Sequence, residues 1–115
     1  MVKPSLKVAV LEALNNMKAR NINALAVGDI TNITDHMIFA SGTSTTHVKS
    51  ISDAVLKETK EFDYLPIGVE GEREAEWILI DLGDVVVHVM LPSTREYYNL
   101  EKLWAHIDIH AAISA

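Results

Sequence analysis

The chain has 115 residues, of which 49% are hydrophobic and 23% charged, and it contains no cysteine. These values are typical of a single soluble domain and exclude a disulfide scaffold or a cysteine-based zinc site. The formal net charge is −6, and residues 61–115 carry the acid excess, with eleven acidic and three basic side chains. Nucleic-acid binding leaves a basic footprint, so we expect no direct nucleic-acid recognition; an acidic half attracts a basic protein surface or keeps the protein soluble.

The sequence shows no membrane or export signal. No apolar run approaches the ~20 residues of a membrane-spanning helix, and residues 1–5 lack the apolar core of a secretory signal. We therefore expect a cytoplasmic protein without a membrane partner. We expect one domain over residues 1–105 and a short tail at residues 106–115.

One helix and two strands are expected in the first forty residues. Apolar side chains recur every three to four positions from Leu6 to Met17, which predicts an amphipathic helix. Ala24–Val27 and His36–Ala40 are short apolar stretches, and Gly28-Asp29 closes the first of them. Both stretches are typical of strands.

A second helix, a short strand and an acidic loop are expected next. Ser41–Thr46 supplies turn and capping side chains for a helix that runs to about Lys60. A brief strand is expected near Ile67–Val69, where Pro66 and Gly68 bound it. Glu70–Glu76 follows as an acidic loop.

A β-hairpin is the clearest pattern in the sequence. Trp77–Leu82 and Val85–Met90 are apolar runs rich in β-branched residues, and the two-residue turn Gly83-Asp84 separates them. A two-residue loop predicts the cross-strand pairs Leu82–Val85, Asp81–Val86, Ile80–Val87, Leu79–His88, Ile78–Val89 and Trp77–Met90. One face is then wholly aliphatic and is expected under a helix: Ile78, Ile80, Leu82, Val85, Val87 and Val89.

The other face of this hairpin has a mixed composition. It carries Trp77, Leu79, Asp81, Val86, His88 and Met90. Aromatic and methionine side chains are enriched at recognition surfaces, so this face is a candidate binding surface. The alternative is that a further helix covers it, with Asp81 and His88 at the edge of the cover.

A last helical segment is expected after the hairpin. Pro92 occupies the N-terminal position that proline favours in helices. The segment continues through Tyr97, Tyr98, Leu100, Leu103 and Trp104.

The turn before the second helix is a candidate enzyme site. Ser41-Gly42-Thr43-Ser44 could cradle a phosphate on its backbone amides, but it lacks the glycine count and the lysine of a P-loop. Ser44 lies near His47 without a third group that would orient the imidazole. These residues do not constitute a catalytic set.

Two candidate metal sites are equally incomplete. Asp81 and Asp84 could hold a divalent cation, but the hairpin turn between them makes Asp84 a turn aspartate that points away from Asp81. His106 and His110 have the i, i+4 spacing of zinc ligands, but the sequence places neither a third ligand nor a general base beside them. We expect no metal and no cofactor.

Several segments together carry a recognisable pattern. They are Asp35, Ser41–Ser44, His47-Val48, Gly68–Gly71, Trp77–Met90 and Arg95–Trp104. Over about residues 5–104 the chain resembles the ribosomal silencing factor family, also called RsfS or Iojap. The resemblance implies an α/β fold: a single domain with a mixed β-sheet of about five strands packed with helices, in a nucleotidyltransferase-like topology.

The resemblance also implies a role that is not enzymatic. Members of this family bind the large ribosomal subunit through its protein number fourteen and prevent the small subunit from joining, which lowers translation under nutrient limitation. The expected partner-binding residues lie on the mixed hairpin face and in the acidic loop: Trp77, Leu79, Asp81, His88, Met90, Glu70, Glu72 and Glu74.

Two further possibilities stay open. One is a nucleotide-binding or nucleotidyl-transferring enzyme that uses the Ser41–Ser44 turn, although the paired metal-binding aspartates of such enzymes are absent after Gly42. The other is a homodimer of the free protein.

Overall fold

A five-stranded mixed sheet forms the centre of the fold, and the computed structural model describes residues 3–102. In spatial order the strands are β1 (Arg20–Ala26), β2 (His36–Ser41), β5 (Val85–Met90), β4 (Trp77–Asp81) and β3 (Gly68–Glu70). Only the central pair, β2 with β5, is parallel, and the other three pairs are antiparallel. The predicted fold class is thereby confirmed.

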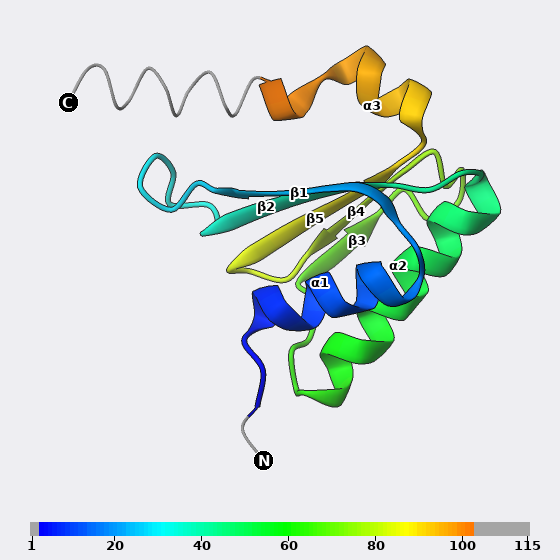
Figure 1. Cartoon of the computed structure of the whole chain (residues 1–115). Helices are drawn as coiled ribbons and strands as arrows, with labels where there is room; N and C mark the ends of the chain where they lie inside the picture. Colours follow the sequence, from blue (N-terminus) through cyan, green and yellow to red (C-terminus); the bar gives the residue numbers. More distant parts are fainter. Residues whose placement is uncertain (1–2, 103–115) are drawn as a thin grey trace.

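Helices lie on both faces of the sheet. α1 (Leu6–Asn16) and α2 (Thr45–Glu61) pack on one face, and α3 (Pro92–Tyr98) lies on the other (Figure 1). Ser5 and Ser44 cap the first two helices, because each hydroxyl accepts a hydrogen bond from an amide of the first turn. The two N-terminal helices that hydrophobic periodicity predicts are both present. Within residues 3–102, no helix has the length and apolar composition needed to cross a membrane.

The main core fills the space between the sheet and the first two helices. The aliphatic hairpin face contributes fully buried side chains such as Ile78, Ile80 and Val87, and Leu14 and Ile51 reach them from the two helices. Burying an aliphatic side chain of this size contributes about 1.5–3 kcal/mol. The prediction that this face lies under helices is confirmed.

The hairpin register matches the predicted one. Trp77 pairs with Met90, and the pairs continue to Asp81 with Val86. Gly83 takes a φ of +86° in the turn, and its amide donates to Oδ1 of Asp81 at 2.9 Å. The carboxylate of Asp81, a residue predicted on the mixed face, therefore stabilises the turn.

Two elements differ from their predicted bounds by more than one residue. β1 begins at Arg20 rather than Ala24. Asn21 has a φ of +51°, but a bulge between Arg20 and Asn23 accommodates it, so the pairing with β2 continues to Arg20. The last helix ends at Tyr98, where Asn99 has a φ of +49°, and residues 100–102 are helical again. Leu103, Trp104 and the predicted tail at residues 106–115 lie outside the described residues.

Candidate binding surface

The face of the sheet opposite α1 and α2 carries the mixed hairpin residues, and we call it the second face. Side chains alternate along a strand, so the strand register aligns the residues of this face in rows. One row runs Asn23, Phe39, His88, Leu79 and Glu70 from β1 to β3. The predicted residues Glu70, Leu79 and His88 are therefore neighbours across three adjacent strands.

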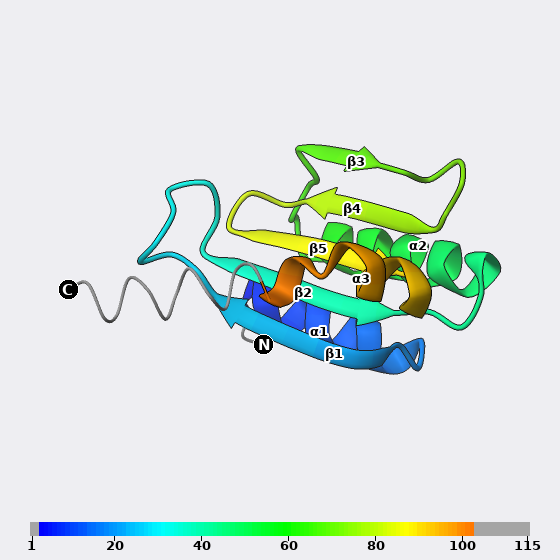
Figure 2. The ribbon, with the colours of Figure 1, turned by 90° about the horizontal axis from the view of Figure 1, so that it is seen from above.

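Half of the second face is covered. Figure 2 shows α3 and the turn after it lying over β2 and β5, with β4 and β3 beyond them. Below this cover a small core is buried, formed by Val27, Met37, Phe39 and Met90, and Leu100 packs against it. The alternative that a further helix covers this face is thus realised over the β1–β2–β5 half.

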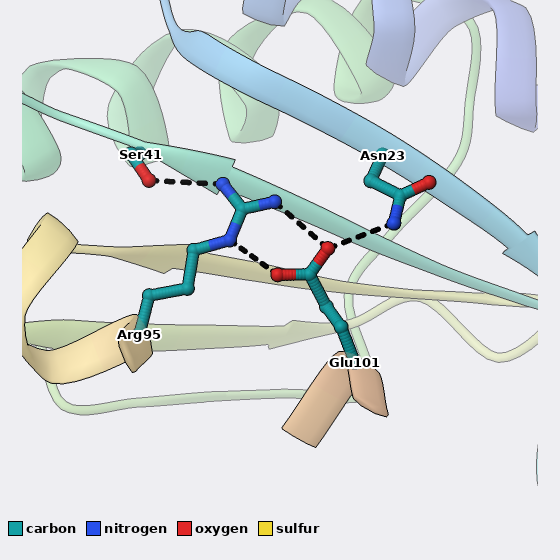
Figure 3. A network of polar contacts seen from close by, with 4 residues as sticks. All are labelled: Asn23, Ser41, Arg95 and Glu101. Atoms are coloured by element: carbon teal, nitrogen blue, oxygen red, sulfur yellow. Dashed lines mark hydrogen bonds and ion pairs between the residues drawn. The ribbon is translucent and has the colours of Figure 1, made fainter. Parts of the chain in front are cut away.

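A polar network fastens the cover to the sheet (Figure 3). The Arg95 guanidinium donates through Nε and Nη2 to the two carboxylate oxygens of Glu101, and through Nη1 to Ser41 Oγ at 2.9 Å. Asn23 Nδ2 donates to Glu101 Oε2 at 2.8 Å. The Arg95 side chain is 14% exposed and that of Glu101 22%, so solvent screens this pair only partly. The hydrogen bond from Arg95 is the main reason that the pKa of Glu101 lies below its ordinary value.

His88 lies beneath the edge of this cover. Its ring stacks on Phe39 with centroids 4.7 Å apart and 9° between the planes, and it is 4% exposed. Trp77 Nε1 donates to His88 Nδ1 at 3.0 Å. Burial lowers the pKa of His88 to about 4, because the charged ring would lose its hydration there.

An aromatic series leads from His88 to solvent. Trp77 is half-buried, and its ring centroid lies 5.0 Å from that of Tyr98. Tyr97 contacts Tyr98 edge-on at 5.1 Å. Tyr98 is 53% exposed and Tyr97 is 82% exposed. Exposed apolar side chains that gather in one patch mark candidate interaction sites.

The other half of the second face is open among the described residues. Leu79 and Asp81 are half-buried on β4, and Glu70 is exposed beside Leu79 on β3. The acidic loop continues from this edge, with Glu74 exposed to solvent. Glu72 instead accepts a hydrogen bond from Lys49 Nζ at 3.0 Å, so its charge is directed to α2 on the opposite face.

The structure therefore divides the predicted contact residues into three groups. Trp77, Leu79, Asp81, Glu70 and Glu74 lie on or beside the open surface. Glu72 lies in the same loop but is paired. His88 and Met90, 4% and 1% exposed, are buried within the chain, so we correct the expectation that their side chains lie on the contact surface. We call Trp77, Leu79, Asp81, Glu70, Tyr97 and Tyr98 the aromatic–acidic surface.

Residues 2–113 match the protein family described as "Ribosomal silencing factor during starvation". The chain belongs to the ribosomal silencing factor family. It is 43% identical over 94 residues to a ribosomal silencing factor of Chromobacterium violaceum, which covers 82% of this chain and 77% of that protein. The crystal structure of a protein from the same organism has a TM-score of 0.87 and 39% identity, and covers 91% of this chain and 88% of the other.

A more distant relative carries a different name. The mouse protein "Mitochondrial assembly of ribosomal large subunit protein 1" is 35% identical over 98 residues, which make up 83% of this chain and 43% of the mouse protein. Ribosomal silencing factor homologues are named for a regulatory role at the ribosome, as the resemblance implied.

In this ribosomal silencing factor, two backbone amides of the Ser41–Ser44 turn already donate hydrogen bonds within the chain. The amide of Gly42 donates to Met90 O, and that of Thr43 donates to His47 Nδ1 at 2.9 Å. His47 Nε2 lies 2.8 Å from Met17 O, so its imidazole bridges the start of α2 to the end of α1. His47 thus links the two helices, and the amides of Gly42 and Thr43 are not free to bind a phosphate.

The metal candidates gain no geometric support. Asp81 bonds its own turn, as described above, and the exposed Asp84 supplies its backbone oxygen to the amides of Asp35 and His36. Within residues 3–102, no three His, Asp or Glu side chains are grouped closely enough to hold a metal ion. His106 and His110 lie outside the described residues.

The sequence alone did not identify the residues that cover the second face of this ribosomal silencing factor or the tyrosines exposed beside Trp77. The sequence places Tyr97 and Tyr98 in the last helical segment and Arg95 and Glu101 in the family pattern, but it assigns no contact to these residues or to Asn23. One signal was present: adjacent residues point about 100° apart on a helix, so two adjacent tyrosines on so short a helix favour exposure of at least one ring.

Proposed function

We propose that the chain binds the large ribosomal subunit through its protein number fourteen, keeps the small subunit from joining, and so represses translation when nutrients are scarce. Its membership of the ribosomal silencing factor family supports this proposal, and the name of the mouse relative includes the large subunit. The proposed action is steric and requires no chemical reaction. The bound protein, whose extents are 40 × 38 × 22 Å, would block the approach of the small subunit. We propose no enzymatic activity and a cytoplasmic location.

One structural observation carries the choice of surface. The exposed ring of Tyr98 contacts Trp77 at the rim of an otherwise buried cluster, and the more exposed Tyr97 contacts Tyr98. Acidic residues lie at the β3–β4 edge of the same face. Aromatic anchors dominate the energy of protein interfaces, while rim charges of one sign steer a partner of the opposite sign. Ribosomal proteins must contact RNA phosphates, and their surfaces are accordingly basic.

Sedimentation of purified ribosomal subunits tests the proposal. Adding the chain to separated subunits should leave the large subunit with bound protein and reduce the fraction of joined particles. Tyr97→Ala should weaken this effect, whereas Val8→Ala, an exposed apolar residue on α1 at the opposite face, should not. Joined particles at the same level with and without the chain would contradict the proposal. The sedimentation of the chain alone also measures whether the free protein is a homodimer.

The enzyme alternative is tested alongside. Calorimetric titration with nucleoside triphosphates should show no binding, because the amides of Gly42 and Thr43 already donate hydrogen bonds within the chain. Nucleotide binding without any effect on subunit joining would reverse the ranking of the two functions.

A further inference from the structure

The proposed function leaves one buried titratable side chain without a role. His88 is at the centre of the second face, yet its ring is covered and cannot touch a partner. Its hydrogen bond reaches outward to Trp77, which is half-buried and belongs to the aromatic–acidic surface. The connection between a buried ring and a surface ring suggests that His88 acts through Trp77.

The chemistry of the bond fixes the state of both rings. An indole Nε1–H can only donate, so His88 Nδ1 must be an unprotonated acceptor. The proton of the neutral imidazole is then on Nε2. Among the described residues Nε2 is buried without a hydrogen-bond partner, so the bond to Trp77 is the polar contact that this ring makes.

The His88 ring is itself held in place. Phe39 stacks on it nearly in parallel, and the row of the sheet fixes the spacing of these two side chains on adjacent strands. The acceptor nitrogen is therefore presented at a defined point at the edge of the buried core. The bonded Trp77 ring lies at 36° to the His88 ring and at 47° to the Tyr98 ring, so it is held between a buried contact and an exposed one.

We infer that His88 is a positioning residue that fixes the indole of Trp77 in the orientation in which the large-subunit partner meets it. This inference rests on the proposed function, because it requires that Trp77 contacts that partner. A side chain that is fixed before binding loses less conformational freedom on association. His88 would therefore raise the affinity by preorganising Trp77. The role differs from that of a contact residue and from that of an ordinary core residue.

Two substitutions distinguish the effect of the hydrogen-bond acceptor of His88 from the effect of its side-chain volume. His88→Asn keeps an acceptor, since Oδ1 of asparagine can occupy a position close to that of Nδ1, whereas His88→Leu keeps the volume and removes the acceptor. We expect His88→Leu to weaken large-subunit binding roughly three- to tenfold, and His88→Asn to retain affinity close to that of the wild type. In a Trp77→Phe background, which lacks the indole N–H, His88→Leu should cause no further loss.

Nuclear magnetic resonance of the full chain gives a readout independent of the ribosome. The chain has two tryptophans, so Trp104→Phe assigns the indole N–H signal of Trp77. That signal should move on His88→Leu and move less on His88→Asn. The wild-type His88 ring should show the Nε2–H tautomer, which tests the bond even where a variant does not fold.

The outcomes distinguish the two proposals. If the wild type does not bind the large subunit, the proposed function fails and this inference fails with it. If the wild type binds but His88→Leu weakens binding equally with and without the Trp77 indole N–H, the proposed function stands and the positioning role is overturned. An Nδ1–H tautomer in the wild-type ring would also overturn it.

Discussion

Arg95 and Glu101 meet across the break in the helix at Asn99, where two guanidinium nitrogens donate to the two carboxylate oxygens. This contact closes the short segment that follows α3 and holds it on the sheet. Because Glu101 also accepts from Asn23 on β1, one carboxylate joins the cover to the edge strand. α3 itself contains no fully buried residue, so this polar contact and the packing of Leu100 hold the cover on the sheet.

We expect Arg95→Met to lower the free energy of unfolding by about 1–3 kcal/mol. This range lies between the cost of breaking an exposed pair and that of breaking a buried one, because the two side chains are partly screened. Urea unfolding of Arg95→Met measures the change, with Glu96→Gln on the exposed side of α3 as the control. Equal stability of the two variants would show that the pair does not hold the cover.

The buried histidine predicts a dependence of stability on pH. The pKa of His88 is about 4 in the folded chain and about 6.5 in the unfolded chain, so the unfolded state binds the proton more readily. The stabilisation from neutral His88 is complete above about pH 6.5 and is lost as the pH falls toward 4, by at most ~3 kcal/mol. Glu101, paired with Arg95, faces His88 and partly opposes the lowering of its pKa.

Unfolding measured between pH 7 and pH 4.5 tests this pH dependence. His88→Asn should lose stability less steeply than the wild type over this range, because the residue no longer titrates. Glu101 has a lowered pKa in the folded chain and also makes stability fall with acid, but it is present in both proteins. Parallel curves for the two proteins would show that His88 does not titrate as described.

Trp77 and Ile80 should respond differently to truncation. Trp77→Ala should weaken large-subunit binding by ~2 kcal/mol or more, about thirtyfold, because an aromatic anchor is lost. Ile80 is fully buried on the helix side, so Ile80→Ala should cost about 2–5 kcal/mol of stability. A urea melt and a large-subunit pull-down on both variants compare the effects. If Trp77→Ala unfolds the chain as severely as Ile80→Ala, Trp77 is a core residue and the assigned surface is wrong.

Gly71 should be far less tolerant of substitution than Gly68. Gly71 has a φ of +87°, and a Cβ there would lie 2.0 Å from the backbone oxygen of Trp77, whereas a Cβ at Gly68 has no atom within 4 Å. Gly71→Ala should therefore destabilise the chain by about 2 kcal/mol or more and displace Trp77. Thermal unfolding should show Gly68→Ala within about 0.5 kcal/mol of the wild type. Similar losses at the two positions would contradict this account.

The exposed acidic loop should act on the association rate. Glu74→Lys should slow binding to the large subunit about threefold at low salt and leave the dissociation rate nearly unchanged, because rim charges steer the encounter. Glu12→Lys on α1 makes the same change in net charge on the opposite face and is the matched control. Stopped-flow binding at two salt concentrations measures both. Equal rates for the two variants would remove the loop from the interface.

Local patterns predicted much of this fold. The period of apolar residues placed α1 and α2, and the two-residue turn fixed every pair of the β4–β5 register. These features depend on residues close in sequence, whose geometry is set by the helical repeat and by turn length. The family pattern then supplied the mixed sheet that local rules cannot assemble.

The second face shows where such reasoning ends. The composition of Trp77, His88 and Met90 fits an exposed recognition surface and also a covered one. The outcome depends on Arg95 and Glu101, which bond to residues of β1 and β2 far away in the sequence. No periodicity encodes that pairing, so it could not be predicted that His88 would be buried while Trp77 stays at the rim.

The parallel pairing of β2 with β5 has a consequence for how the chain folds. It joins His36 to Val85 and Ser41 to Met90, residues about fifty positions apart, at the centre of the sheet. The β4–β5 hairpin can form locally, but the central pair requires closure of a long loop that includes α2. Such non-local contacts slow folding, so we expect the chain to fold in milliseconds or longer rather than in microseconds. Until that closure, β2 and the finished hairpin each present an unpaired strand edge to neighbouring chains in the cell.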